Sequence, residues 1–348
     1  MDERSEQTQT IVRRDRVAVT AVVATYNEEE YIGRCLLALL AQKPVDGSVE
    51  ILVIDGGSAD RTVDIVRSFP EFGHRIRLVN NPRRLQVYAW NIALREMRGE
   101  YFAMMTAHAD YAHDYFARCI ETLDRTGAAA VGGVPRAHGD GALGNAVAFC
   151  MSTPFGVGGA RFRYLTREES CDTVPLIFAR RETIEATGGW DERIAFDEDS
   201  DMSYRLRERG GKLIVSPAIG VKYYVRHSFK ALWKQMYRYG YWRRFTQLKH
   251  PSEVPVRVMA PTLFLAALAA SASIAFTPLR PLALVVPILY LGFVGVAAIS
   301  AIARIGRNGL LVPAALLTMH TAYGIGYGKA LIRMRPQRAG KPARTPAH

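Results

Sequence analysis

The feature that most restricts the fold of this chain is an alternation, in its first third, of short apolar runs with segments of helical periodicity. The run VAVTAVVA at residues 17–24 is apolar almost throughout, as expected of a strand buried on both faces of a parallel sheet. The same patterns predict strands at 51–54, 75–79 and 100–105 and helices at 31–40, 59–69 and 86–97. This order of elements predicts a doubly wound α/β sheet with right-handed crossovers.

Polar side chains follow three of the predicted strands where each strand ends, at Thr25, Asp55 and Thr106. Open α/β sheets bind ligands at this edge, so we expect a binding site there. Asn27 is expected to cap the helix after the first strand. No G-x-G-x-x-G follows the first strand and no G-x-x-x-x-G-K-[ST] occurs in the chain, which argues against dinucleotide and P-loop sites.

The segment GGWDERIAFDEDSDMSYRLRER at residues 188–209 gathers carboxylates just before an amphipathic helix. Met202 and Leu206 are expected to face the core, and Arg205 to face water with the neighbouring arginines. The positive field at a helix N-terminus favours ionised carboxylates, so Asp199 is a candidate general base. The alternative is that these acids only cap the helix and pair with nearby arginines.

Composition restricts the possible partners. The chain has 348 residues and a formal net charge of +12, which indicates an anionic partner such as nucleic acid, phospholipid or a phosphorylated substrate. The basic residues cluster beside apolar segments rather than along one soluble face, which argues against nucleic acid. The four cysteines form no C-x-x-C pair and are expected to be reduced core thiols of a cytosol-facing domain.

The C-terminal third predicts membrane attachment. Residues 228–248 combine an aromatic face with a basic face, which suits a helix at the membrane interface, with a core-packing helix as the alternative. Residues 259–277 and 282–303 are uncharged and long enough for bilayer spans, and 310–327 is a weaker third segment. Three spans would place the basic C-terminal tail outside the cell, so we expect two spans and a third, re-entrant or interfacial segment.

These patterns predict five regions. They are a disordered tail at 1–16, an α/β domain at 17–227, an interfacial amphipathic helix at 228–250, a transmembrane region at 251–335 and a basic tail at 336–348. Within the α/β domain, residues 212–215 and 221–225 are expected to form two further strands.

Four stretches together resemble glycosyltransferase family 2, and most closely its membrane-attached succinoglycan-biosynthesis type. They are ATYNEEEYIGRCLLALLAQ, VIDGGSADRTVDIV, GGWDERIAFDEDSDMSYRLRERGGKL and QMYRYGYWRR. The resemblance extends from about Val17 to about Gly328. It implies a GT-A-like mixed sheet, doubly wound, and a nucleotide-diphosphate sugar donor, with UDP as the expected nucleotide.

The resemblance also implies roles for residues of the α/β domain. Thr25 and Glu28 would lie at the first nucleotide-contacting loop, and Thr106 would lie near the donor as well. Asp55 would hydrogen-bond the base, with a turn-forming aspartate before Gly-Gly as the alternative. Glu198 and Asp199 match the Glu-Asp motif of the family, with Asp199 as the catalytic base.

A second motif of the family lies further along the chain. Gln235, Arg238 and Tyr239 match the Gln-x-x-Arg-Trp acceptor motif, with Tyr in place of Trp. Arg238 would steady the diphosphate and Tyr239 would stack against a sugar ring, with lipid-facing anchoring as the competing role for both.

The metal motif departs from the family pattern. Where the family has Asp-x-Asp, or Asp-Ala-His-Ala, this chain has Thr106 followed by Ala107, His108 and Ala109. Because hard divalent cations prefer charged oxygen ligands, His108 and Asp110 would have to hold Mg²⁺ or Mn²⁺. Alternatively, an arginine or lysine neutralises the leaving diphosphate.

The expected function is that of an inverting glycosyltransferase in the cell membrane, multi-pass, with a cytoplasmic catalytic domain. It would move a sugar from a UDP-sugar donor to a lipid-linked, polyprenyl-type acceptor in exopolysaccharide or cell-surface glycan synthesis. The alternative is a non-catalytic membrane protein that binds a nucleotide sugar or scaffolds a polysaccharide complex. The missing carboxylate at Thr106 favours this alternative, whereas the retained Asp55, Glu198 and Asp199 favour the enzyme.

Overall fold

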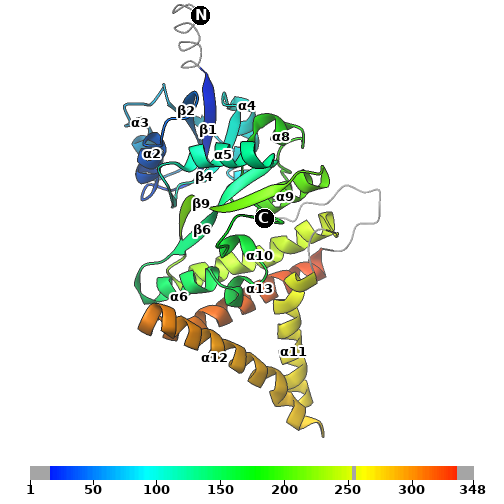
Figure 1. Ribbon diagram of the computed structural model, residues 1–348. Coiled ribbons are helices and arrows are strands. Elements are labelled where there is room, and N and C mark those ends of the chain that lie inside the picture. Colours follow the sequence, from blue (N-terminus) through cyan, green and yellow to red (C-terminus); the bar gives the residue numbers. More distant parts are fainter. Residues whose placement is uncertain (1–15, 253–255, 335–348) are drawn as a thin grey trace, which may run out of the picture. The chain divides into compact units, whose positions relative to one another are not determined.

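The computed structural model describes residues 16–252 and 256–334, which form two compact units (Figure 1). The first unit takes in the described residues up to Arg136 together with Tyr164–Tyr223. The second takes in Ala137–Arg163 and the described residues from Tyr224 onward. The segment Ala137–Arg163 therefore packs with the C-terminal helices and not with the sheet that precedes it in the chain.

The first unit is built on a mixed sheet with the strand order β3-β2-β1-β4-β8-β6-β9-β5, in which β7 also pairs with β9. The strands are β1 (Val17–Thr25), β2 (Ser48–Asp55), β3 (Ile76–Asn80), β4 (Tyr101–Thr106), β5 (Ala109–Tyr111), β6 (Ala130–His138), β7 (Glu169–Ser170), β8 (Phe178–Arg180) and β9 (Leu213–Tyr224). Strands β1 to β4 pair in parallel, whereas the pairs that β8, β5 and β7 make are antiparallel. The doubly wound mixed sheet expected from the sequence is confirmed.

Helices of this unit pack on the sheet through apolar stripes. They are α2 (Ile32–Leu40), α3 (Thr62–Arg67), α4 (Gln86–Glu96), α5 (Tyr115–Thr126), α8 (Arg181–Glu185) and α9 (Glu198–Glu208). On α2 the stripe consists of Ile32, Leu36 and Leu39, which are fully buried and follow the i, i+4, i+7 spacing. Burial of each such side chain contributes roughly 1.5–3 kcal/mol relative to exposure, so these stripes fix the helices on the sheet.

Two local expectations in the loops beside α2 and α3 are wrong. Asn27 does not cap a helix, because α2 begins only at Ile32 and Asn27 has a left-handed backbone with φ 55°. Its Oδ1 instead accepts a hydrogen bond from the Ala59 N–H at 2.8 Å. The helix expected at 59–69 is shorter, Thr62–Arg67, because this hydrogen bond helps to hold Ala59 in the preceding loop.

The two strands expected at 212–215 and 221–225 are one strand, β9. Pro217 lies inside it although proline cannot donate to a strand ladder. The position is tolerated because Pro217 lies between the stretch that pairs with β7, up to Val215, and the stretch that pairs with β5, from Val221. All four cysteines are free in the structure, and Cys35, Cys119 and Cys150 are buried.

The register of the parallel strands brings their carboxyl ends to one edge. Thr25, the last residue of β1, pairs with Asp55, the last residue of β2. Asp55 pairs in turn with Asn80 at the end of β3, and Ala24 pairs with Thr106 at the end of β4. The polar residues that the sequence places after separate strands are therefore neighbours in space, as expected for the ligand-binding edge of such a sheet.

The second unit is helical. Its elements are α6 (Gly141–Met151), α7 (Pro154–Val157), η1 (Arg161–Arg163), α10 (Phe229–Lys249), η2 (Val256–Met259), α11 (Ala260–Ile274), η3 (Arg280–Leu284), α12 (Val285–Ile305), η4 (Gly306–Leu311) and α13 (Val312–Arg333). Helices α10 and α13 run side by side (Figure 1). A Cβ added at Gly240 would lie 2.1 Å from the Tyr323 carbonyl oxygen, and one at Gly326 would lie 2.2 Å from that of Tyr237. The two backbones are thus in direct contact through glycines on both helices.

Two helical stretches are long and apolar enough to cross a membrane by length and composition: Val256–Ile274, and Arg280–Arg333, which contains α12 and α13. Large apolar side chains on α12 are exposed, among them Leu289 and Ile299, which are 69% and 71% accessible. Exposed apolar helices of this length are weak evidence for membrane association.

Candidate active site

The loops after β1 and β2 are joined by reciprocal hydrogen bonds. The Asn27 N–H donates to Ser58 Oγ at 2.9 Å, while the Ala59 N–H donates to Asn27 Oδ1 at 2.8 Å. The Glu28 N–H donates to Thr62 Oγ1 at 2.8 Å. These bonds hold the two loops as one rigid border at the carboxyl edge of the sheet.

Asp55 lies at the centre of this border and is nearly fully buried. Its Oδ2 accepts from the N–H groups of Gly57 and Ser58, both at 2.9 Å, and its Oδ1 accepts from Ser58 Oγ at 2.6 Å and from Thr25 Oγ1 at 3.2 Å. A carboxylate offers about four acceptor positions, so these bonds use its capacity. In this structure Asp55 forms the turn before Gly57, which is the alternative reading of its sequence position.

Thr106, His108 and Glu28 lie close together at the end of β4. Thr106 Oγ1 is 3.2 Å from His108 Nδ1, and the same ring nitrogen is 3.5 Å from Glu28 Oε1. Asp110 is directed differently, since Arg34 Nε lies 3.2 Å from its Oδ1. Of the two residues expected to hold a metal, His108 thus has a nearby carboxylate, whereas Asp110 is paired with a cation.

The side chains around His108 decide whether a metal ion fits. Among residues 16–252 and 256–334, no group of three or more His, Cys, Asp and Glu side chains is arranged to hold a metal ion. Mg²⁺ in nucleotide sites commonly takes only one or two carboxylates and completes its shell with substrate phosphates and water. Glu28 and His108 therefore fit a cation that is bound together with a diphosphate, but they do not form a site for the metal alone.

The acidic pair lies in the first turn of α9. The residue before this helix, Asp197, has a left-handed backbone with φ 75°, and Glu198 and Asp199 follow it. Burial, together with the negative charges of Asp199 and Asp197, raises the pKa of Glu198 to about 8. Glu198 therefore holds a proton at neutral pH.

The alternative role for these acids, pairing with arginines, holds for Asp201. Its carboxylate is 1% exposed and lies 2.9 Å from Arg205 Nε. Within the part of the chain that the structure describes, no arginine or lysine forms an ion pair with Asp199, whose Oδ1 accepts from the Ser200 N–H at 2.8 Å. The expectation that Arg205 faces water is wrong, because its guanidinium donates to the Gly189 carbonyl at 2.6 Å.

Aromatic packing holds the segment before α9 on the sheet. The Trp190 ring centroid lies 5.0 Å from that of Phe102 on β4 and 6.4 Å from that of Trp90 on α4. The amide of Asn91, also on α4, bonds both backbone groups of Trp190. Asn91 and Arg205 are residues of this region that the motifs do not single out. For Asn91, a polar side chain among the apolar positions of a helix is a signal, whereas helical periodicity gives no such signal for Arg205.

Gln235, Arg238 and Tyr239 lie on α10, in the second unit. Gln235 Nε2 donates to the Tyr239 hydroxyl at 3.2 Å. Burial and, in second place, the positive charge of Arg226 lower the pKa of Arg238. Arg226 precedes α10 in the chain, so this second positive charge comes from outside the helix.

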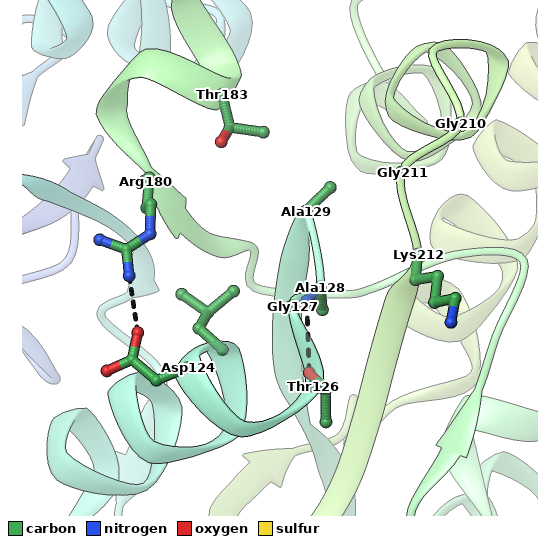
Figure 2. A pocket seen from close by; sticks show the side chains of 11 residues that line it. Asp124, Thr126, Gly127, Ala128, Ala129, Arg180, Thr183, Gly210, Gly211 and Lys212 are labelled. Atoms are coloured by element: carbon green, nitrogen blue, oxygen red, sulfur yellow. Dashed lines mark hydrogen bonds and ion pairs between the residues drawn. The ribbon is translucent and has the colours of Figure 1, made fainter.

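The first unit also contains a cavity of about 550 Å³ (Figure 2), which none of the candidate site residues lines. Arg180, which lines it, pairs with Tyr101 at the start of β4, whereas Thr106 ends that strand. The six residues of β4 put roughly 16 Å between these two edges of the sheet. Arg180 Nη2 donates to Asp124 Oδ1 at 2.6 Å. Figure 2 shows this pair at one side of the cavity and Lys212 at the other. This cavity is not part of the candidate active site.

Comparisons with known proteins agree with this geometry. The model of glycosyl transferase family 2 matches residues 20–187, and that of glycosyl transferase family group 2 matches residues 176–302. The succinoglycan biosynthesis protein ExoA of Rhizobium meliloti (strain 1021) is 28% identical over 318 residues, which are 90% of this chain and 95% of that protein.

Two further relatives extend the comparison. A dolichyl N-acetyl-alpha-D-glucosaminyl phosphate 3-beta-D-2,3-diacetamido-2,3-dideoxy-beta-D-glucuronosyltransferase of Methanococcus voltae is 29% identical over 230 residues, 64% of this chain and 71% of that protein. The solved mannosyltransferase PcManGT from Pyrobaculum calidifontis, in complex with GDP-Man and Mn²⁺, matches with a TM-score of 0.57 at 22% identity, over 92% of this chain and 88% of that chain. This chain belongs to glycosyltransferase family 2 and is a glycosyltransferase of glycan synthesis with a GT-A fold.

Proposed function

We propose that this protein is an inverting, membrane-attached glycosyltransferase that moves a sugar from a UDP-sugar to a polyprenyl-linked acceptor. The observation that carries the proposal is the acidic pair at the start of α9. The raised pKa of the partly buried Glu198 keeps its proton in place, and Asp199 has no arginine or lysine ion pair among the described residues. Such a carboxylate is suited to general base catalysis.

The reaction would be a single in-line displacement. Asp199 removes the proton from an acceptor hydroxyl, and the resulting oxygen nucleophile attacks the anomeric carbon from the side opposite the diphosphate. The bond between that carbon and the diphosphate oxygen breaks, and its electron pair leaves with UDP. Inversion at the anomeric carbon follows from the single displacement.

The donor would lie at the edge formed by the ends of β1, β2 and β4. Thr25, Glu28 and Thr106 border this edge, and we propose that Asp55 contributes by fixing the loop that contacts the base. Glu28 and His108 would hold Mg²⁺ or Mn²⁺ there, with Asp110 nearby in sequence but paired with Arg34. When bound, the cation would neutralise charge on the leaving diphosphate. The relative PcManGT, named as a complex with GDP-Man and Mn²⁺, supports a nucleotide-sugar donor with a divalent ion.

The acceptor would be held close to a membrane. Arg238, whose neighbour Arg226 adds a second positive charge, would contact a phosphate, and Tyr239 would stack on a sugar ring. The relative from Methanococcus voltae carries a dolichyl-linked sugar phosphate in its name, and the Rhizobium relative is named for succinoglycan biosynthesis. The first name supports a lipid-linked acceptor, and the second supports a role in the synthesis of an exopolysaccharide or another cell-surface glycan.

The membrane attachment would use α11 and α12 as two spans, with the catalytic domain in the cytoplasm. Helix α10 carries six charged side chains, so it cannot cross a bilayer but can lie at its surface. Because α13 is in backbone contact with α10, we propose that α13 lies at the interface as well. Two spans would return the basic C-terminal residues to the cytoplasmic side, as the positive-inside rule prefers.

The direct test is nucleotide release by the purified protein in lipid nanodiscs. A panel of UDP- and GDP-sugars is supplied with a polyprenyl-diphosphate-linked sugar, with Mn²⁺ or with a chelator. We expect release of UDP from one UDP-sugar that depends on the acceptor. Binding of nucleotide sugars without release from any of them would favour the non-catalytic alternative, and release of GDP alone would contradict the UDP assignment.

A further inference from the structure

The side chain of Asn91 forms hydrogen bonds with Trp190, in the segment that precedes α9. Its Oδ1 accepts from the Trp190 N–H at 2.8 Å, and its Nδ2 donates to the Trp190 carbonyl at 2.9 Å. The side-chain amide thus bonds both the N–H and the carbonyl group of one residue, as the backbone of a paired strand does in a sheet. Asn91 thereby connects the middle of α4 to the segment that leads to the acidic pair.

The glycines before Trp190 make this close approach possible. Gly188 and Gly189 have φ values of 82° and 78°, which residues other than glycine rarely adopt. A Cβ at Gly189 would lie 2.8 Å from Asn91 Oδ1. The two glycines before Trp190 therefore allow the backbone conformation that brings this segment into contact with Asn91.

Arg205, on α9, forms hydrogen bonds with the same segment. Its Nη1 donates to the carbonyl oxygens of Gly189 at 2.6 Å and Thr187 at 3.2 Å, while its Nε pairs with the buried Asp201 at 2.9 Å. Arg205 and Asp201 belong to the helix whose first turn carries Glu198 and Asp199. The segment 187–190 is thus held between α4 and α9.

The helix α4 begins near the carboxyl ends of the parallel strands, where the sugar donor is proposed to bind. The loop that enters it, residues 82–85, follows the end of β3, and Asn81 in front of this loop bonds both Asp55 and Leu85 through its N–H and Nδ2. Arg83 of the same loop forms an ion pair with Glu192 at 3.1 Å. Asn81 therefore connects Asp55 to the start of α4, and the contacts of Asn91 and Arg205 connect the middle of α4, through residues 187–190, to Asp201 in the first turn of α9.

We propose that Asn91 and Arg205 are positioning residues that fix the place of Asp199 relative to the bound donor. This inference rests on the proposed role of Asp199 as the base. General base catalysis requires the carboxylate within hydrogen-bond reach of the acceptor hydroxyl, and a displacement of about 1 Å can lower the rate about 100-fold. Neither residue touches the reacting atoms in this proposal, so their effect falls on the chemical step and not on donor binding.

The test compares Asn91→Ala with Gln42→Ala. Gln42 is a matched control, because its amide also holds a loop backbone, that of Ala112 at 2.8 Å, but at a place that leads to α5. We expect Asn91→Ala to lower kcat about 10- to 100-fold while the donor KM changes by less than about twofold. Gln42→Ala is expected to lower the melting temperature to a similar degree and to leave kcat near the wild-type value.

A second readout does not depend on activity. Hydrogen exchange of the peptide covering residues 196–204 is expected to accelerate in Asn91→Ala and to stay unchanged in Gln42→Ala. If Asn91→Ala does not fold, Arg205→Lys replaces it, since lysine keeps the charge beside Asp201 but loses the forked contact with Gly189 and Thr187.

The outcomes separate this inference from the proposed function. A wild-type protein without donor turnover contradicts the proposed function, and the exchange of residues 196–204 then tests the positioning alone. Unchanged exchange there in Asn91→Ala overturns the inference. So does an active wild type whose Asn91→Ala variant loses only stability, with kcat unchanged.

Discussion

At the scale of residues, Glu198 and Asp199 are neighbours with different surroundings. Burial and two adjacent carboxylates act on Glu198 and raise its pKa to about 8, from an ordinary value near 4.5. A protonated Glu198 removes one negative charge from the first turn of α9. With Glu198 protonated, the two neighbouring carboxyl groups are not both ionised, so they do not repel each other as two negative charges would.

This difference predicts a pH dependence of stability. In the unfolded chain Glu198 loses its proton at an ordinary pKa, whereas in the folded protein it keeps the proton until about pH 8. The folded state therefore loses stability as pH rises from about 5 to about 8, and the loss levels off above that. Glu198→Gln has no proton to lose, so its melting temperature relative to wild type should increase over this range. A difference that stays constant with pH would contradict the raised pKa of Glu198.

The missing carboxylate of the metal motif leads to a second prediction. Thr106 Oγ1 lies 3.2 Å from His108, which is 3.5 Å from Glu28. A carboxylate placed there by Thr106→Asp would add a charged oxygen to this imidazole and carboxylate. We expect the affinity for Mn²⁺ in the presence of UDP to rise about tenfold, measured by titration calorimetry. Asp110→Asn serves as the control and should leave the affinity close to that of the wild type, because Arg34 already holds this side chain.

The residues of the site differ in how well the sequence predicts them. Asp199 and Glu198 are found from their place in an acidic run before a helical pattern, and the structure puts both in the first turn of α9. Arg205 is predicted wrongly, because helical periodicity assigns it to the outer face and carries no information about the carbonyl groups of Gly189 and Thr187. Those contacts depend on a left-handed Gly-Gly turn that only the folded chain reveals.

At the scale of elements, the contact between α10 and α13 is the feature that most shapes the second unit. It uses Gly240 and Gly326, one on each helix, where a side chain would collide with the facing backbone. Close approach through glycines is the common means by which helices pack where lipid provides no hydrophobic drive. The sequence predicts both helices, but not this pairing, because periodicity does not identify the partner of a helix face.

Substitution of these glycines tests the pairing. Gly240→Ala and Gly326→Ala should each destabilise the protein by about 1–3 kcal/mol, since the added methyl group forces the backbones apart. Gly292→Ala and Gly295→Ala on α12 are the controls, because an added Cβ meets no atom within 4 Å there. They should be neutral or stabilising by up to about 1 kcal/mol. Unfolding in detergent measures all four, and equal effects at the two pairs would contradict the contact.

At the scale of the whole molecule, the sequence predicts the order of strands and helices better than it predicts which segments belong to each compact unit. The parallel strands are found to within a few residues because buried strands have no polar face. The segment Ala137–Arg163 packs with the C-terminal helices, however, and no composition change marks this at the sequence level. Contacts between residues far apart in the chain decide such boundaries, and local patterns do not contain them.

The proposed topology makes a prediction for the intact protein in its membrane. With α11 and α12 as the two spans, the turn around Arg280 would lie on the side of the membrane opposite the catalytic domain, and the end of α13 would lie on the same side as that domain. A cysteine at Arg280 should react with an impermeant maleimide added outside the cell, whereas one at Arg333 should react only after lysis. Reaction of Arg333→Cys in intact cells would indicate three spans.

The most direct test of the central claim compares Asp199→Asn with the wild type in single-turnover transfer to the lipid-linked acceptor, with UDP binding measured on both. Loss of a general base typically lowers the rate about 10²- to 10⁴-fold. We predict a loss of this size in Asp199→Asn, with UDP bound as tightly as by the wild type. Transfer by Asp199→Asn at close to the wild-type rate would contradict the account, because the acceptor would then need no base at this position.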